Sequence, residues 1–370
     1  MNIIENFFYS FLFLTNRLIN LSFSESIFSK YENYMISKYL SKREIQSQDI
    51  PIIQKDELTN EIFLQLSNNY RKPIIIKEFF KDSNAVQNWD LDYFKGILNN
   101  FELDILDKDA KEINKIKYDD FYNRVKTENI YINNNSSIFC NFPKIFNDIQ
   151  KNYFDFKKII HSFNLSKLHV IHLFMGYNSK DKISGTNIHC AGNGNMFCMI
   201  KGIKKWVLID PKYSFLLKGR LSKSGIHAQS LFDMPDFDIS KTPDILKHIP
   251  RYEINLEPGD VLWNAPWWWH RIQNLNQDSE NIGIAIRYPK ITYKLFQNNF
   301  LYSISGYNYF IYNSLFIKLY EKLFSSKEII QKEIKNDKNN NVLNQIKELT
   351  KKHPETLQLS DIINIHLKDK

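Results

Sequence analysis

The sequence predicts a mainly β fold with flanking helices, in which the central strands form a jelly roll or a closed barrel. Between residues 167 and 288, short apolar runs of strand length alternate with turns that contain Gly or Pro-Gly. On both sides of this region the apolar pattern is that of helices. The predicted strands are Leu168–Gly176, Thr186–Cys190, Met196–Lys201, Lys205–Ile209, Tyr252–Leu256, Val261–Asn264, Trp268–Gln273 and Ile282–Tyr288.

The chain before the predicted barrel begins with a helical segment and continues with shorter elements. Residues 1–45 mix apolar and polar positions as a helix does. Asp56 or Thr59 can cap a helix that runs over residues 60–67. The β-branched run of residues 74–76 is typical of a buried strand.

Further elements are predicted up to residue 132 and again after the barrel. Residues 82–94 indicate a turn and a helix, and residues 103–106 a strand. A short helix and then a strand are predicted within residues 117–132. The chain turns helical again after Pro289. We therefore divide it into an N-terminal helical segment (1–70), a central β domain (71–290) and a C-terminal helical segment (291–370).

Two connections in the central domain stand out. Glu257-Pro258-Gly259-Asp260 predicts a tight hairpin turn, since Pro fixes one turn position and Gly relieves another. The stretch from Lys212 to Pro250 is long for a loop, and loops of this length in compact domains are often functional.

The composition is that of a folded protein. Hydrophobic residues make up 43% of the chain and aromatic residues 15%. The net charge of +8 comes from evenly spread lysines, so we expect a solvated surface and no nucleic-acid partner. Cys140, Cys190 and Cys198 have neither CxxC spacing nor an even number, which favours reduced thiols and a cytoplasmic protein.

Two apolar stretches bear on membranes and on assembly. The run from Phe7 to Leu14 is too short to span a bilayer core of about 30 Å and lacks the basic flank of a signal peptide. We expect a helix packed on the main domain there, with an interfacial anchor as the alternative. The apolar stretch from Leu295 to Phe324 is compatible with a homodimer through C-terminal helices or with contact with a membrane surface.

Two histidines lie in predicted strands that are remote in sequence, His189 and His270. Two neutral imidazoles and one carboxylate on one face of a metal suit non-haem Fe(II), because open positions remain for substrate and oxygen. The carboxylate usually follows the first histidine by two residues, and Ala191 occupies that position.

Several segments together resemble the jumonji-C or cupin-8-like Fe(II)/2-oxoglutarate oxygenases over roughly Lys72 to Pro289. They are KPIII, WDLDYF, Thr-x-x-His with Asn six residues later, IKGIKKWVLIDP, FDMPDF and EPGDVLWNAPWWWH. The resemblance implies a double-stranded β-helix and makes residues 71–290 a catalytic domain. It also implies Fe(II) held by His189 and His270, and oxidation of a protein side chain or a small molecule.

The resemblance also implies a 2-oxoglutarate pocket. A dicarboxylate needs a cation and neighbouring hydroxyl or amide donors. Lys204 lies at the family's lysine position, and Thr186, Asn195 and Tyr131 match positions that relatives use for the same cosubstrate. Arg287 is an alternative cation.

Ala191 departs from the family pattern and leaves four alternatives. In the first, the metal binds through the two histidines together with water or a ligand from elsewhere. In the second, chloride takes the place of the carboxylate, as in some iron halogenases. In the third, the domain binds no iron and only binds a partner without catalysis, and in the fourth, another metal is used. His172 and His227 are further candidates to approach the metal. Cys190 should point away from it, because neighbouring strand residues face opposite sides.

Overall fold

The strands of the protein form two sheets that face each other across an apolar interior. The structure is a computed structural model that describes residues 3–19, 22–40, 49–107, 112–128, 130–159, 170–179, 185–222, 227–232, 244–288 and 301–302. Within these residues one sheet has nine strands in the order β1-β2-β13-β8-β15-β6-β5-β3-β4 and the other has six in the order β10-β11-β7-β14-β9-β12. The strands are β1 (Ile52–Gln54), β2 (Ile74–Lys77), β3 (Glu102–Leu106), β4 (Glu112–Lys117), β5 (Tyr131–Asn135), β6 (Val170–Asn178), β7 (His189–Ala191), β8 (Gly194–Lys201), β9 (Lys204–Ile209), β10 (Gly219–Leu221), β11 (His227–Ser230), β12 (Arg251–Leu256), β13 (Val261–Asn264), β14 (Trp269–Asn274) and β15 (Ser279–Tyr288).

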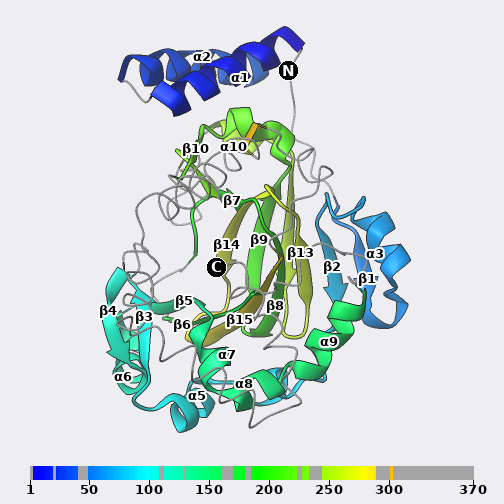
Figure 1. Cartoon of the computed structure of the whole chain (residues 1–370), viewed down its shortest axis with the longest axis vertical. Coiled ribbons are helices and arrows are strands. Elements are labelled where there is room, and N and C mark those ends of the chain that lie inside the picture. Colours follow the sequence, from blue (N-terminus) through cyan, green and yellow to red (C-terminus); the bar gives the residue numbers. More distant parts are fainter. Residues whose placement is uncertain are drawn as a thin grey trace, which may run out of the picture.

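The two sheets form the jelly roll that the sequence predicts (Figure 1). Aromatic side chains pack between the sheets. Phe197 of β8 lies with its ring centre 5.1 Å from that of Trp206 on β9, and 5.9 Å from Phe174 on β6. Because side chains alternate along a strand, these contacts identify the interior face of each strand involved. Each predicted barrel strand is present, with ends that differ from the predicted ones by at most three residues.

The turn at residues 257–260 is not a hairpin, which corrects the prediction. β12 pairs with β9 in the six-stranded sheet, whereas β13 pairs with β2 and β8 in the nine-stranded sheet. The turn therefore carries the chain from one sheet to the other. The buried carboxylate of Asp260 accepts hydrogen bonds from Lys77 Nζ at 2.5 Å and from the Glu78 backbone N–H at 3.1 Å. Gly259 has a φ of +95°, which suits glycine.

The long connection between residues 212 and 250 is not a plain loop. Its described part contains a 3-10 helix η2 (Pro211–Leu216), strands β10 and β11, and a short helix α10 (Asp244–His248). β11 pairs with β7, so this stretch extends the six-stranded sheet. Sequence periodicity could not reveal such short strands, because three or four residues are too few to set a period.

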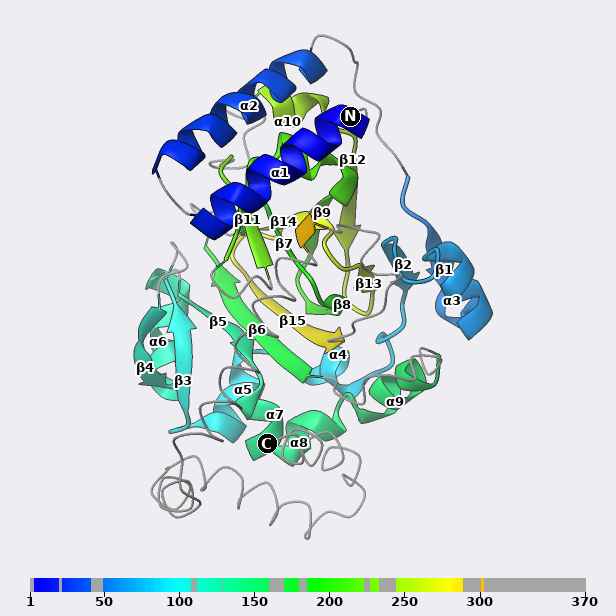
Figure 2. The ribbon, with the colours of Figure 1, turned by 45° about the horizontal axis from the view of Figure 1, so that its top comes forward.

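Helices lie against both sheets. Along the nine-stranded sheet lie the helices from α3 to α9 (Figure 1), while α1 and α2 cross the outer face of the six-stranded sheet (Figure 2). The helix bounds are α1 (Ile3–Ile19), α2 (Ser22–Leu40), a 3-10 helix η1 (Lys55–Glu57), α3 (Asn60–Leu66), α4 (Asn84–Asn88), α5 (Leu91–Leu98), α6 (Tyr118–Glu128), α7 (Ser137–Asn141), α8 (Pro143–Asn147) and α9 (Gln150–Ile159). Thr59 caps α3, since its hydroxyl accepts a hydrogen bond from the Ile62 N–H at 3.2 Å.

The predicted N-terminal helix is divided into α1 and α2, and α1 packs on the barrel through one face only. Tyr9 and Phe13 are buried against the outer face of the six-stranded sheet. The opposite face exposes a stripe of Ile4, Phe7, Phe8 and Phe11. None of the described helices is both long enough and apolar enough to cross a membrane. The predicted C-terminal helical segment lies outside the described residues except for residues 301–302.

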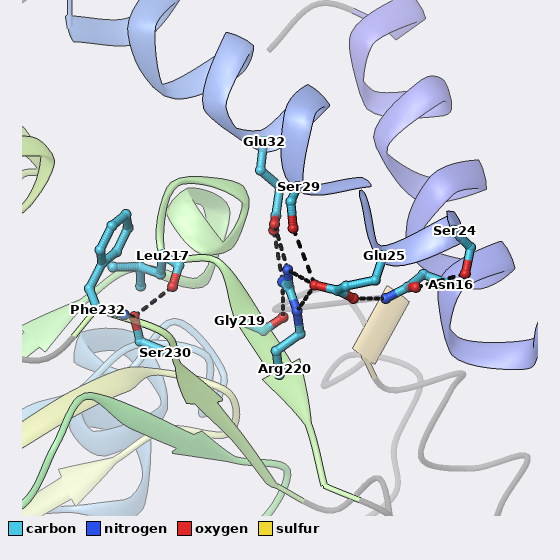
Figure 3. Close-up of polar contacts among 10 residues, drawn as sticks. All are labelled: Asn16, Ser24, Glu25, Ser29, Glu32, Leu217, Gly219, Arg220, Ser230 and Phe232. Carbon is cyan, nitrogen blue, oxygen red and sulfur yellow. Dashed lines mark hydrogen bonds and ion pairs between the residues drawn. The ribbon is translucent and has the colours of Figure 1, made fainter. Parts of the chain in front are cut away.

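An ion-pair cluster ties α2 to β10 (Figure 3). The guanidinium of Arg220 donates to Glu32 at 2.8 and 3.0 Å and to Glu25 at 2.7 and 3.2 Å. The Glu32 side chain is fully buried. Burial raises the pKa of Glu32, although Arg220 acts in the opposite direction. The cluster therefore holds α2 on the barrel only while Glu32 and Arg220 are both charged.

We expect Arg220→Ala to lower the free energy of unfolding by about 3–5 kcal/mol, because it leaves the buried Glu32 carboxylate without its partner. Chemical denaturation measures the change. Arg124→Ala is the matched control, since Arg124 pairs with Glu128 on an exposed helix face and its loss should have a much smaller effect. Equal losses of unfolding free energy in the two variants would contradict the stabilising role of the Arg220 cluster.

Candidate functional site

The pairing of β7 with β14 brings the two predicted metal ligands together. His189 and His270 are directly opposite in the antiparallel register. Their ring centres lie 4.2 Å apart, and Trp206 stacks on the far side of His270 at 5.4 Å. Since Trp206 faces the interior, both imidazoles do as well. Two rings from strands remote in sequence are therefore close enough to bind one ion.

Backbone carbonyl groups fix which ring nitrogen of each imidazole carries the proton. His189 Nδ1 lies 2.8 Å from the Asn187 carbonyl oxygen, and His270 Nδ1 lies 2.9 Å from that of Trp268. A carbonyl oxygen only accepts, so Nδ1 of each ring donates and Nε2 keeps its lone pair. Metal-binding histidines commonly have this arrangement, because it orients the ring and makes the other nitrogen available.

Both imidazoles are neutral near pH 7. Burial lowers the pKa of His189, and the charges of His227 and Arg287 act in the same direction. Burial also lowers the pKa of His270 well below its ordinary value, with His189 as a further cause. Neutral imidazole is the form that binds a metal ion.

Lys204 points into the same interior, beside the end of β14. Alternation along β9 puts it on the face of Trp206, and its Nζ donates to Asn274 Oδ1 at 2.5 Å. Burial lowers the pKa of Lys204 to about 8. On the other edge of β14, Thr186 Oγ1 accepts from the Ile272 N–H at 3.2 Å. The lysine and threonine thus flank one strand.

The other two predicted cosubstrate residues lie on the facing nine-stranded sheet. Asn195 shares the interior face of β8 with Phe197, and Tyr131 lies opposite Gly176 of β6. Burial raises the pKa of Tyr131 to about 12, so its hydroxyl stays protonated. Lys204, Asn195 and Tyr131 therefore lie in strands that line the barrel, and Thr186 lies three residues before β7.

Two buried polar atoms at this interior have no hydrogen-bond partner within the described part of the chain. They are Asn195 Oδ1 and Trp206 Nε1. A buried polar group left unpaired costs about 1–3 kcal/mol, so a polar ligand in this interior would gain from bonding to these atoms. The donor set fits a metal with an oxo acid: two imidazole lone pairs, a buried ammonium group and amide groups.

Within the described residues, no acidic side chain completes the histidine pair. Among the described residues, no three His, Cys, Asp or Glu side chains are grouped so as to hold a metal ion. Cys190 is buried on the outer face of β7, as predicted. Arg287 lies on β15 opposite Asn195, and its charge acts on the pKa of both candidate ligands. His172 Nδ1 bonds to the Asn134 carbonyl oxygen at 2.8 Å.

The structure adds residues that sequence reasoning missed. Trp206 and Asn274 contact His270 and Lys204 directly. Trp206 follows Lys204 by two residues, so the alternation of side chains along a strand could have predicted that Trp206 faces the same interior. Gln229 lies opposite His189, but β11 falls in the stretch read as a loop, so nothing in the sequence assigned its face.

A jelly roll whose interior carries a facing pair of histidines is the arrangement of the cupin class of proteins. The sequence profile of the cupin-like domain matches residues 60–289, and the chain belongs to this family. The predicted family resemblance is confirmed. Proteins of the JmjC and cupin-like family are generally Fe(II)- and 2-oxoglutarate-dependent oxygenases.

Curated relatives come from Dictyostelium discoideum. JmjC domain-containing protein E is 24% identical over 66% of this chain and 86% of its own length. JmjC domain-containing protein A is 24% identical over 60% of this chain and 90% of its length. JmjC domain-containing protein D is 32% identical over 25% of this chain and 20% of its length.

Lys204 should make stability depend on pH above neutrality. Its pKa is about 8 in the folded chain against an ordinary value of 10.5, so between these values the unfolded chain holds more protons at this group. Stability contributed by Lys204 therefore rises with pH across this window. We expect the free energy of unfolding of the wild type to rise relative to Lys204→Met from pH 8 to 10.5. Parallel curves would show that the ammonium group is solvated.

Proposed function

We propose that the protein is an Fe(II)- and 2-oxoglutarate-dependent oxygenase that oxidises a C–H bond of a protein side chain or a small molecule. The observation that carries the proposal is the facing pair of His189 and His270, with both Nε2 lone pairs available beside the buried Lys204. Bound iron would supply the activation of O2, in which one oxygen atom goes to the C–H bond of the substrate and the other oxidises 2-oxoglutarate to succinate and carbon dioxide.

The chain's own residues orient and shield the reactants. His189 and His270 hold the metal through Nε2, while carbonyl groups fix their rings. The Lys204 ammonium group pairs with the distal carboxylate of 2-oxoglutarate, and the Thr186 and Tyr131 hydroxyls and the Asn195 amide bond to the same cosubstrate. Trp206 and Phe197 exclude water from the interior.

Two alternatives from the sequence remain separable by experiment. Halogenation rests on Ala191 alone, which leaves room for chloride beside the metal. A barrel that binds without catalysis would take up a small acid or peptide but would gain no stability from Fe(II) with 2-oxoglutarate. The cation pair of Lys204 and Arg287 would serve that function equally well.

Anaerobic addition of Fe(II) and 2-oxoglutarate should produce a visible charge-transfer band, and admission of oxygen should release succinate. His189→Ala and His270→Ala should abolish both signals. His172→Ala is the control, because this histidine bonds to the Asn134 backbone on the other sheet. A band that changes on addition of chloride favours halogenation. The proposal fails if neither the wild type nor Ala191→Asp gives a band or succinate.

The affinity for 2-oxoglutarate should fall as pH rises through about 8. Below this pH Lys204 is already charged, whereas above it binding must take up a proton, because the bound dianion favours the ammonium form. Calorimetry in buffers of different ionisation enthalpy measures this uptake. Lys204→Met should remove the pH dependence and weaken binding about 30-fold or more, as for loss of about 2 kcal/mol or more.

The matched control is Lys205→Met. Lys205 is the next residue on β9, faces outward and pairs with Glu253 at 2.6 Å. The Lys205→Met variant should retain the wild-type affinity for 2-oxoglutarate and its pH dependence. Equal losses in the two variants would mean that the general charge of the strand, and not the buried ammonium group, attracts the dianion.

A further inference from the structure

We infer that His227 supplies the third protein ligand of the metal and takes the place of the carboxylate that Ala191 lacks. The centre would then be a set of three imidazoles, His189, His227 and His270. This inference rests on the metal-binding part of the proposed function. It concerns which side chain completes the site, and it can fail while the oxygenase proposal holds.

The strand register places His227 beside the position of the missing ligand. β11 pairs antiparallel with β7, and His227 lies directly opposite Ala191. Side chains directly opposite in an antiparallel pair have Cβ atoms about 4.5–5.5 Å apart. Because Ala191 follows His189 by two residues, both lie on one face of β7. His227 therefore shares the face from which a carboxylate at residue 191 would reach the metal.

Burial shows that this face is the barrel interior. Ala228 and Cys190, which are also opposite each other, are fully buried in the apolar cluster beneath α1 and α2. Their neighbours His227 and Ala191 must therefore point to the other side of the sheet, where His189 meets His270. Figure 2 shows β11, β7 and β14 lying side by side beneath α1.

The electrostatics of the two histidines agree with this placement. Besides burial, the charge of His227 is one of the causes that lower the pKa of His189. The side chain of Ala191 between them is a single methyl group, which leaves room for the longer ring. An imidazole carries its outer nitrogen farther from the backbone than an aspartate carries its oxygens, which offsets part of the distance of one strand.

The three imidazoles are not grouped around one point in this structure, because the side chain of His227 is exposed. A change of side-chain rotamer brings the ring inward, and such a change is fast for an exposed residue. Three neutral imidazoles give a bound Fe(II) ion a higher net charge than two imidazoles with a carboxylate. The 2-oxoglutarate dianion offsets this charge when it binds.

Gln229 is the main competitor for the third ligand position. It lies on the same face of β11 as His227 and directly opposite His189. An amide oxygen is a hard ligand and binds Fe(II) less strongly than an imidazole does. Gln229 therefore serves as the matched variant: it has the same strand, the same face and similar exposure, but no ring nitrogen.

Two measurements on the full-length chain test the inference without relying on turnover. Anaerobic competition titration gives the affinity for Fe(II), and X-ray absorption at the iron edge counts imidazole ligands through their outer-shell scattering. We expect three imidazoles in the wild type and two in His227→Ala. The affinity should fall by at least about 10–100-fold, the range that loss of even an outer partner of a metal ligand produces.

The variants distinguish the competing assignments. Gln229→Ala should keep three imidazoles and the wild-type affinity. The double variant Ala191→Asp with His227→Ala should recover the affinity, because the carboxylate returns to its usual position. Two imidazoles in the wild type, or a loss in Gln229→Ala but not in His227→Ala, would overturn the inference. If the inference about His227 is overturned but the wild type still releases succinate, the oxygenase proposal stands. If the wild type binds no Fe(II), the inference and the oxygenase proposal both fail.

Discussion

The antiparallel pairing of β7 with β14 is the constraint on which the candidate site depends. β7 has only three residues, yet its register with β14 decides whether His189 meets His270. A shift of one residue would turn His189 to the outer face, where Cys190 now packs beneath α1 and α2. The apolar cluster on the outer face, which includes Trp269 and Ala228, therefore stabilises the register that directs His189 and His270 to the interior face. The helix pair contributes to the site although it supplies no residue to it.

The charges around this pair are unusual for a site that holds a divalent cation. The imidazoles are neutral, Arg287 adds a positive charge that acts on both of them, and Lys204 on the interior face of β9 is also cationic. If a divalent cation and a dianion bind together, the dianion offsets the positive charges of the metal, Lys204 and Arg287. Metal and oxo acid should therefore bind cooperatively, as expected when two ligands interact favourably within one interior. The same balance would favour binding of a metal ion beside the two imidazoles although residue 191 supplies no carboxylate.

Local sequence patterns predicted much of the barrel. Strands such as Val261–Asn264 appeared with their predicted bounds because their apolar runs are flanked by Pro and Gly. The position of Lys204 followed from family spacing, and its depth in the interior required the structure. The face of His227 could not be assigned from sequence, because β11 is short and its burial depends on β7, some 40 residues earlier in the chain. The turn at Gly259 was mistaken for a hairpin for a similar reason: turn chemistry specifies a reversal of the chain, but not which sheet the next strand joins.

The central claim is that two imidazoles from remote strands present Nε2 to one ion, and nitrogen NMR on protein with ¹⁵N-labelled histidine tests it most directly. Long-range proton–nitrogen spectra distinguish a protonated ring nitrogen from one with a lone pair. The claim predicts that His189 and His270 both carry the proton on Nδ1 and that Nε2 of both rings shifts with the same first equivalent of Zn²⁺, a diamagnetic substitute for Fe(II). A shift of only one ring, or protonated Nε2 in either, would contradict it.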